Sequence, residues 1–228
     1  MQYQSIAENA IILTFPDDRD RSLELLAIQH QLTNQKLPIS ETVLGYCTLT
    51  IYFDPFRISH DEISSIATKI GHSKQYSDRE KGTFHRIPVC YDPIFGLDID
   101  HVATSHQLTI EEVIRLHTSP TYDIAFLGFS PGFPFLTGMD KKLATNRKET
   151  PRREVSKGAV GIAGGEQTGV YPSASPGGWN IIGRTPIELL PLKEGKPTLF
   201  YPGGDQLSFY AISPSEFYEI YEEEQNKK

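Results

Sequence analysis

Apolar residues in the first third of the chain recur in two patterns, one typical of strands and the other typical of helices. Residues 3–7 and 10–15 are short apolar segments, and residues 47–53 alternate apolar and polar side chains with period two, which is typical of strands. Apolar residues recur at helical spacing from about residue 20 and again after Ser59, which precedes its helix as an N-cap would. Two helices and four or five strands at this length predict a compact α+β domain.

The remainder of the chain opens with two helical patterns and then becomes β-rich. The second of these helices begins at a capping box, in which Thr109 is answered by Glu112. Fourteen of the eighteen glycines lie between residues 128 and 204, where short apolar segments alternate with Gly and Pro turns, a pattern that favours an antiparallel barrel or sandwich. The segments expected as strands are residues 84–89, 124–129, 159–163, 179–182, 187–190, 198–201 and 206–212, followed by a short acidic helix. The change of regime predicts two domains, residues 1–83 and residues 84–228, or one domain with a loop-rich half.

Composition places the chain among acidic, folded proteins. Apolar residues make up 38% and charged residues 22%, with 12 Phe and 11 Tyr, which is too aromatic for a disordered chain. The 22 Lys and Arg against 29 Asp and Glu give a net charge of −7, which repels nucleic-acid phosphates and anionic lipid, so we expect no nucleic-acid or membrane partner. No apolar run is long enough to span a membrane and the first residues lack a signal-peptide pattern, which predicts a cytoplasmic protein.

The two cysteines, Cys47 and Cys90, lie in apolar segments with strand-like patterns. Two cysteines make no disulfide framework, and neither has a neighbouring Cys or His at metal-ligand spacing. We therefore expect ordinary thiols and no metal site.

An aromatic loop is the densest motif. Residues 127–136 read Leu-Gly-Phe-Ser-Pro-Gly-Phe-Pro-Phe-Leu, in which Pro and Gly stiffen the backbone that carries three rings. The motif is either a rigid loop that plugs a barrel end or the wall of a binding site or interface. The residues assigned to that wall or interface are Phe129, Pro131, Gly132, Phe133, Phe135 and, further along the chain, Trp179, although a lone Trp beside two glycines is more often part of a core.

Residues 161–169 are rich in glycine and enclose three consecutive polar side chains, Glu166, Gln167 and Thr168. Glycines let backbone N–H groups turn toward an anion, but no G-x-x-x-x-G-K-[ST] phosphate loop is present. The segment is either a wide turn between strands or a place where hydrogen-bonding chemistry meets a ligand.

Charge gathers in residues 141–157, which hold seven Lys and Arg against two Glu. A solvated loop is the usual explanation, and a phosphate-binding site for a polyanion such as ATP is the alternative. The cations proposed as phosphate clamps are Arg147, Arg152, Lys157 and, outside this run, Arg184. His117 ends the capped helix, where it either complements the helix dipole or serves as a general base.

Six motifs in the same order resemble those of the KipI family, also called allophanate hydrolase subunit 1, which includes the B subunit of the prokaryotic 5-oxoprolinases. The resemblance spans nearly the whole chain and is densest from about residue 84 to residue 186. The motifs are His117-Thr-Ser, Gly128-Phe-Ser-Pro-Gly-Phe-Pro-Phe-Leu, Thr150-Pro-Arg, Gly158-Ala-Val-Gly-Ile, Gln167-Thr-Gly-Val-Tyr-Pro and Ser175-Pro-Gly-Gly-Trp-Asn-Ile-Ile-Gly-Arg-Thr-Pro.

The resemblance implies a ferredoxin-like N-terminal domain followed by a cyclophilin-like β-barrel domain. It also implies one component of an ATP-dependent 5-oxoprolinase, which opens 5-oxo-L-proline to L-glutamate and is inactive without its partners. Those partners would be the KipA-like C subunit and the lactam-binding A subunit of the enzyme. The ATP would be shared with a partner and accompanied by Mg, with no tightly bound cofactor. Two alternatives stay open, an inhibitor that blocks the autophosphorylation of a histidine kinase and a true allophanate hydrolase subunit 1.

The sequence and the resemblance together assign two kinds of site role. His117 and Glu166 are the candidate catalytic residues. The candidate substrate- or nucleotide-binding residues are Gln167, Thr168, Tyr171, Arg147, Arg152, Lys157 and Arg184.

Overall fold

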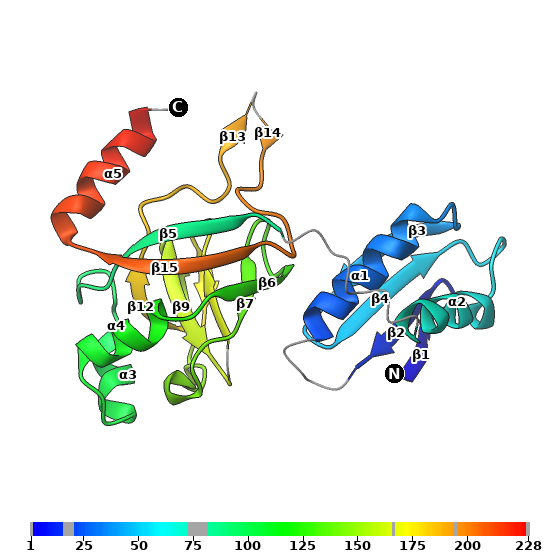
Figure 1. Ribbon diagram of the computed structural model, residues 1–228, viewed down its shortest axis with the longest axis horizontal. Helices are drawn as coiled ribbons and strands as arrows, with labels where there is room; N and C mark the ends of the chain where they lie inside the picture. Colours follow the sequence, from blue (N-terminus) through cyan, green and yellow to red (C-terminus); the bar gives the residue numbers. More distant parts are fainter. Residues whose placement is uncertain (1, 16–20, 73–81, 166, 194–195, 227–228) are drawn as a thin grey trace. The chain divides into compact units, whose positions relative to one another are not determined.

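The computed structural model describes residues 2–15, 21–72, 82–165, 167–193 and 196–226. Contacts divide the chain into two compact units, Met1–Lys81 and Gly82–Lys228, each with its own hydrophobic core. The fold is α+β, and the larger unit contains a closed seven-stranded barrel (Figure 1).

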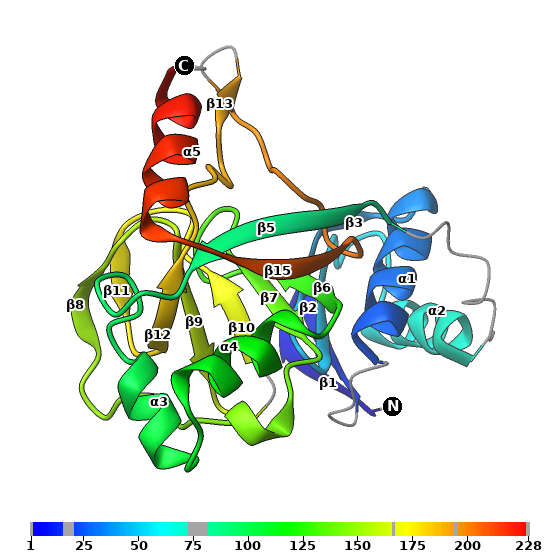
Figure 2. The same cartoon turned by 60° about the vertical axis from the view of Figure 1, so that its left-hand side comes forward.

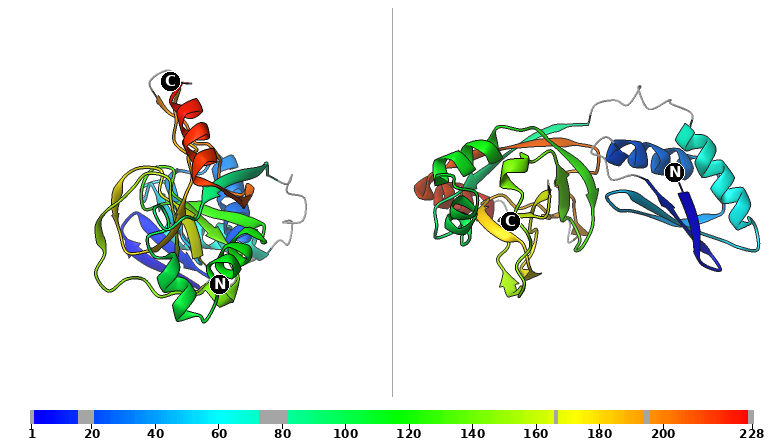
Figure 3. Two further views of the ribbon diagram at one scale, coloured as in Figure 1. Left: turned by 90° about the vertical axis from the view of Figure 1, so that its left-hand side faces the viewer. Right: turned by 90° about the horizontal axis from the view of Figure 1, so that it is seen from below.

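The first unit is a four-stranded antiparallel sheet with both helices on one face (Figure 3). Its sheet order is β1-β2-β4-β3. Its elements are β1 (Gln2–Ala7), β2 (Ala10–Thr14), α1 (Arg21–Asn34), β3 (Ile39–Leu44), β4 (Thr48–Phe53) and α2 (His60–His72).

The buried residues of this unit lie at the positions that the strand and helix patterns of the sequence indicate. Along β4 the buried residues are Leu49, Ile51 and Phe53, alternate positions that place their side chains on the same face of the sheet. Burying an apolar side chain of this size stabilises a fold by about 1.5–3 kcal/mol. Ser59 caps α2 as expected, because its backbone N–H donates to Glu62 Oε2 over 2.9 Å and its Oγ accepts from the backbone N–H of Glu62.

The second unit is built around the barrel, whose strand order is β10-β7-β6-β15-β5-β12-β9. Neighbouring strands are antiparallel except β5 and β15, which run parallel from Phe84–Gln206 to Cys90–Ile212. The barrel strands are β5 (Phe84–Cys90), β6 (Tyr122–Leu127), β7 (Pro134–Thr137), β9 (Ala159–Ala163), β10 (Gln167–Val170), β12 (Asn180–Arg184) and β15 (Gln206–Ile212). The other elements are α3 (Ile99–Ser105), α4 (Ile110–Thr118), the 3-10 helix η1 (Lys141–Leu143), β8 (Arg152–Val155), β11 (Ser175–Gly177), β13 (Leu192–Lys193), β14 (Lys196–Pro197) and α5 (Pro214–Asn226).

Helices and short strands surround the barrel. The strands β8 and β11 pair with each other outside it, and α3 and α4 lie together against it (Figure 2). Side chains of both helices join the interior cluster of the barrel, while α5 projects from the end of β15 with only Phe217 buried (Figures 1 and 2). None of the described helices is long and apolar enough to cross a membrane.

The barrel wall has a different core on each side. Along β9 the larger side chains Val160 and Ile162 belong to the interior cluster, whereas Ala159 and Ala163 belong to a second, outer cluster. Gly161 lies between them, and a Cβ there would lie 3.1 Å from the Cβ of Trp179. Small outward residues on β9 therefore let aromatic rings pack closely against the outside of the wall.

Two expected strands are absent. Residues 187–190 and 198–201 have no strand assignment, and they are joined instead by single hydrogen bonds such as Phe200 N–H to the Leu189 carbonyl at 3.2 Å. Apolar composition alone favours strands here, but flanking prolines withhold the backbone donors that a ladder requires. The acidic helix expected at the end of the chain is confirmed as α5.

Candidate functional site

His117 lies at the centre of a buried hydrogen-bond network that begins on α4. The helix starts at the predicted Thr109 capping box and ends by placing His117 in the barrel interior with no exposed surface. The His117 Nδ1 lies 2.7 Å from the Tyr91 hydroxyl and its Nε2 lies 3.0 Å from Thr168 Oγ1. Because Thr168 Oγ1 donates to the Gly161 carbonyl over 3.0 Å, it accepts from His117, which places the imidazole proton on Nε2.

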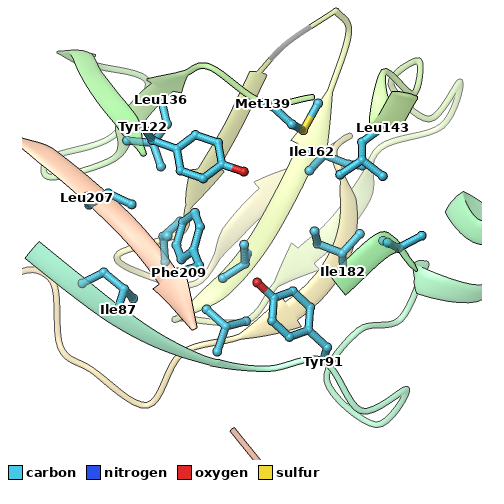
Figure 4. Packing of buried hydrophobic residues seen from close by; sticks show 14 of the residues in the cluster. Ile87, Tyr91, Tyr122, Leu136, Met139, Leu143, Ile162, Ile182, Leu207 and Phe209 are labelled. Atoms are coloured by element: carbon cyan, nitrogen blue, oxygen red, sulfur yellow. The ribbon is translucent and has the colours of Figure 1, made fainter. Parts of the chain in front are cut away.

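Both nitrogens of the His117 ring and the hydroxyls around them therefore have partners. Tyr91 donates to the unprotonated Nδ1, and Tyr122 donates to the His117 carbonyl over 2.7 Å. The hydroxyls of Tyr91 and Tyr122 point into the middle of the interior cluster (Figure 4). The His117 ring also stacks on Phe209 with centroids 4.7 Å apart. Burial lowers the pKa of His117 to about 3, so the imidazole is neutral at neutral pH.

The glycine-rich segment forms the turn between β9 and β10. Gly164 has a φ of +59°, a left-handed backbone that favours glycine, and Gly165 is exposed. Gln167 opens β10 and is half-buried, whereas Thr168 is buried in the His117 network. Glu166 lies outside the described residues. The structure thus brings together His117 and Thr168, two of the residues predicted from sequence.

The aromatic loop joins β6 to β7 and is divided between surface and core. Phe129 is 65% exposed with a φ of +65°, an uncommon backbone for a residue with a side chain. Pro131 is exposed, while Gly132 and Phe133 are buried. The loop lines an apolar groove of about 530 Å³ together with Leu127, Leu190 and Leu199.

Behind the loop, aromatic rings form the outer cluster of the barrel wall. Phe133 meets Trp179 and Tyr171 edge to face at centroid distances of 5.3 and 5.1 Å, and the half-buried Phe135 lies 5.8 Å from Trp179. Gly177 makes room for the Tyr171 hydroxyl, because a Cβ there would lie 2.3 Å from that oxygen. Burial raises the pKa of Tyr171, against a backbone hydrogen bond from Trp179 and two nearby arginines.

The carboxylate of Asp98 connects three segments of the chain beside this cluster. Its carboxylate accepts from Arg152 through two bonds of 2.8 and 2.7 Å, from Lys148 Nζ over 2.8 Å and from the Ile181 backbone N–H over 2.7 Å. These donors come from β8, from the loop before it and from β12. Burial alone would raise the pKa of Asp98, and the cationic and backbone donors outweigh it, so the pKa is lowered.

The four predicted phosphate clamps are not gathered at one place. Arg152 is held by Asp98, and Lys157 pairs with Glu188. Arg184 donates to the Lys157 carbonyl over 2.8 Å and lies over the Phe217 ring. Arg147 differs, because it forms no ion pair with any described residue and lines a pocket of about 640 Å³ between α3 and the loop before β8.

The predicted site residues also lie at two ends of the barrel. In the antiparallel pair β7–β10, Leu136 is the register partner of Thr168. Pro134 and Gln167 therefore lie at opposite ends of this strand pair. The aromatic loop leads into β7 at Pro134, and the glycine-rich turn enters β10 at Gln167. The barrel therefore keeps the aromatic loop and the glycine-rich turn apart.

Two residues of these networks are not evident from the sequence. Asp98 reads at most as a helix cap, yet its side chain makes no capping bond and binds Lys148 and Arg152 instead. Tyr91 carries no signal, because it directly follows an apolar strand.

Residues 1–200 match the family profile described as carboxyltransferase domain, subdomain C and D. The 5-oxoprolinase B subunit of Bacillus subtilis (strain 168) is 35% identical over 99% of this chain and 98% of its own length. The chain belongs to the carboxyltransferase subdomain C and D family. The 5-oxoprolinase B subunit of Haemophilus influenzae (strain ATCC 51907 / DSM 11121 / KW20 / Rd) is 36% identical over 92% of this chain and 97% of its own length.

A solved structure shares the fold within a longer chain. The crystal structure of TTHA0988 in space group P6522 has a TM-score of 0.75 and 32% identity over 90% of this chain. This chain spans 40% of that protein's length, so the family's fold also occurs as part of a longer polypeptide.

Proposed function

We propose that this chain is the B subunit of an ATP-dependent 5-oxoprolinase, which opens 5-oxo-L-proline to L-glutamate together with its A and C subunits. The observation that carries the proposal is the end-to-end similarity to the two 5-oxoprolinase B subunits, which covers 92–99% of this chain and 97–98% of theirs. A match over the whole of both chains indicates the same module, whereas a local match would indicate a shared fold only.

The chemistry explains why a lactam hydrolase of this kind needs ATP. Hydrolysis of an unstrained five-membered lactam is uphill, so the amide oxygen is first phosphorylated by ATP and water then attacks the activated carbon. Such a reaction needs cations at the phosphates, a base near the water and a pocket that excludes bulk solvent. Mg would accompany the ATP, whose phosphates it neutralises.

Within the part of the chain that the structure describes, the four predicted phosphate clamps do not gather into one site. Among the described residues, three of the four predicted clamps, Arg152, Lys157 and Arg184, are engaged by other groups of the same chain. The proposal therefore places ATP chiefly on a partner, and a contribution from Arg147 stays a prediction. We expect the isolated chain to be inactive.

The proposed partners are the KipA-like C subunit and the lactam-binding A subunit. The longer relative TTHA0988, of which this chain matches 40%, supports an assembly with further chains, because domains fused in one protein commonly associate as separate chains in another. The aromatic groove around Phe129 is a candidate surface for such a contact.

A finer fold assignment belongs to the same proposal. From β2 to α2 the first unit follows the β-α-β-β-α order of a ferredoxin-like fold, and the strand beside β2 is β1, which precedes it, instead of a strand after the second helix. We propose a permuted ferredoxin-like unit and a cyclophilin-like barrel.

Reconstitution tests the function. The chain is purified alone and with the A and C subunits, and glutamate release from 5-oxo-L-proline is measured with and without ATP. We expect turnover only in the complete mixture with ATP. Turnover by the single chain, or none by a complex shown to be assembled, contradicts the proposal.

The exposed Phe129 ring and its apolar groove favour a second candidate, a binding module that docks on a histidine kinase and blocks its autophosphorylation. The same preparation separates the two candidates. If Phe129→Ala abolishes kinase inhibition and the complete mixture shows no lactam hydrolysis, the binding module is the better description.

A further inference from the structure

The pocket beside Arg147 has the size and lining of a site for a small polar ligand. Its volume is about 640 Å³, within the range of small-molecule sites. One wall comes from α3 and the residue after it, the other from the loop between η1 and β8, and the remaining contact from the start of β12. The lining residues are His101, Ser105, His106, Ala144, Thr145, Asn146, Arg147, Lys148, Glu149, Thr150 and Asn180.

The polar wall is preformed by bonds within the chain. Asn180 donates its side-chain amide to the Asn146 carbonyl over 2.8 Å. His106 Nε2 lies 2.9 Å from Thr145 Oγ1, and that hydroxyl donates to the Leu143 carbonyl over 2.9 Å. These bonds fix the loop that carries Arg147, so the pocket exists before a ligand arrives.

Among the described residues that line the pocket, Arg147 is a cation without an ion-pair partner. Its guanidinium lies over the Trp179 ring, 5.9 Å from the centroid, and that ring is held in place by Phe133 and Phe135. A cation–π contact with a buried ring orients a guanidinium and uses none of its N–H donors. No described residue forms an ion pair with Arg147, whereas Lys148 donates to Asp98.

The charge of the pocket selects the class of ligand. Arg147 and Lys148 against Glu149 leave one net positive charge, and the value does not change when Asp98 and Arg152 behind Lys148 are counted. One positive charge matches a monoanion and falls short of a triphosphate. A planar carboxylate also matches the two parallel donors of a guanidinium edge.

We propose that this pocket binds the carboxylate of a small amino-acid-derived metabolite, with Arg147 as its charge partner. The choice of metabolite rests on the proposed function, which offers two carboxylates, 5-oxo-L-proline and L-glutamate. The remainder of the ligand would lie against the imidazoles and hydroxyls of α3, where His101 and Ser105 line the wall.

Calorimetric titration of the full chain tests the proposal with four probes. 5-Oxo-L-proline and L-glutamate distinguish the two sources, 2-pyrrolidinone is the same lactam without a carboxylate, and inorganic phosphate reports general anion binding. We expect one of the two carboxylates to bind, with affinity at least tenfold weaker in Arg147→Ala and partly restored in Arg147→Lys. The matched control is Arg153→Ala, which removes an exposed cation of β8 outside the pocket and should leave the affinity unchanged.

The same variants in the assembled complex separate this inference from the function on which it rests. We expect Arg147→Ala to raise the KM for 5-oxo-L-proline at least tenfold if that lactam is the ligand. The pocket proposal is contradicted, and the proposed function is not, if the Arg147→Ala complex turns over with an unchanged KM and the titration shows no role for Arg147. The titration shows no role for Arg147 if carboxylate binding is unchanged in Arg147→Ala or is absent from the parent chain. Carboxylate binding that depends on Arg147 in a chain whose complex shows no turnover supports the pocket and contradicts the function. Preference for phosphate over both carboxylates also overturns the proposal.

Discussion

Two polar groups of the barrel unit differ in their partners, His117 in the barrel interior and Arg147 beside the outer wall. Inside, the imidazole of His117 has both nitrogens occupied by Tyr91 and Thr168 and no surface exposed. Outside, Arg147 is oriented by Trp179 but forms no ion pair with a described residue. The comparison shows that a chemically capable residue type does not by itself define a site, because a group whose hydrogen bonds are all made within the chain is not available to a ligand.

The largest expected effect tests the interior. His117→Ala leaves a cavity and removes the partner of the Tyr91 and Thr168 hydroxyls, so we expect a loss of about 3–5 kcal/mol in the free energy of unfolding. Urea denaturation of the chain measures it, and His101→Ala, an exposed histidine of α3, is the control with a change below about 0.5 kcal/mol. Full stability combined with a complex slowed a hundredfold would instead assign His117 to catalysis.

A somewhat smaller effect is expected where the outer wall is closed by an ion pair. Asp98→Asn leaves Arg152 and Lys148 facing an amide, and we expect a loss of about 2–4 kcal/mol, because both cations are partly solvated and recover some hydration. Chemical denaturation measures the loss. A change below about 1 kcal/mol would show that the outer wall does not depend on this carboxylate.

The pH dependence of stability sharpens the interior case. His117 has a pKa of about 3 in the folded chain against an ordinary value of 6.5, so between these values the unfolded chain binds the extra proton. Stability contributed by the neutral ring is complete above pH 6.5 and falls by about 1.4 kcal/mol per pH unit below it. We expect the difference in unfolding free energy between the parent and His117→Gln to shrink by about 2 kcal/mol from pH 7 to pH 5. An imidazole that titrates near pH 6.5 in the folded chain, followed by NMR, would contradict this.

The smallest effect on stability is expected at the exposed end of the outer wall. Phe129→Gly removes a ring that is mostly in solvent and relieves its positive φ, so the unfolding free energy should change by less than about 1 kcal/mol. Its neighbour Phe133 is buried, and Phe133→Ala should cost about 3–5 kcal/mol. Thermal unfolding compares the two. Equal losses would mean that Phe129 is part of the core.

Local features can be predicted from the sequence and long-range ones cannot. The Thr109 capping box and the Ser59 cap follow from residues three apart, and both are confirmed. The basic run suggests one cationic site, but the partners of its cations lie far away in the sequence. Arg152 pairs with Asp98, 54 residues away, and Lys157 pairs with Glu188, 31 residues away. The periodicity of apolar residues does not show which carboxylate a cation pairs with or which loops lie at the same end of the barrel. Both depend on how distant strands come together when the barrel closes.

The parallel pair β5–β15 has a consequence for how the barrel unit folds. Its first and last strands are neighbours, and His85 and Asp205, which are linked by a 2.6 Å contact, lie 120 residues apart in the chain. During synthesis β5 and β6 emerge with open edges that only β15 can cover, so closure waits for the C-terminal strand. Translation that stalls before Gln206 therefore leaves a sheet with two unpaired edges, a substrate for chaperones and for aggregation.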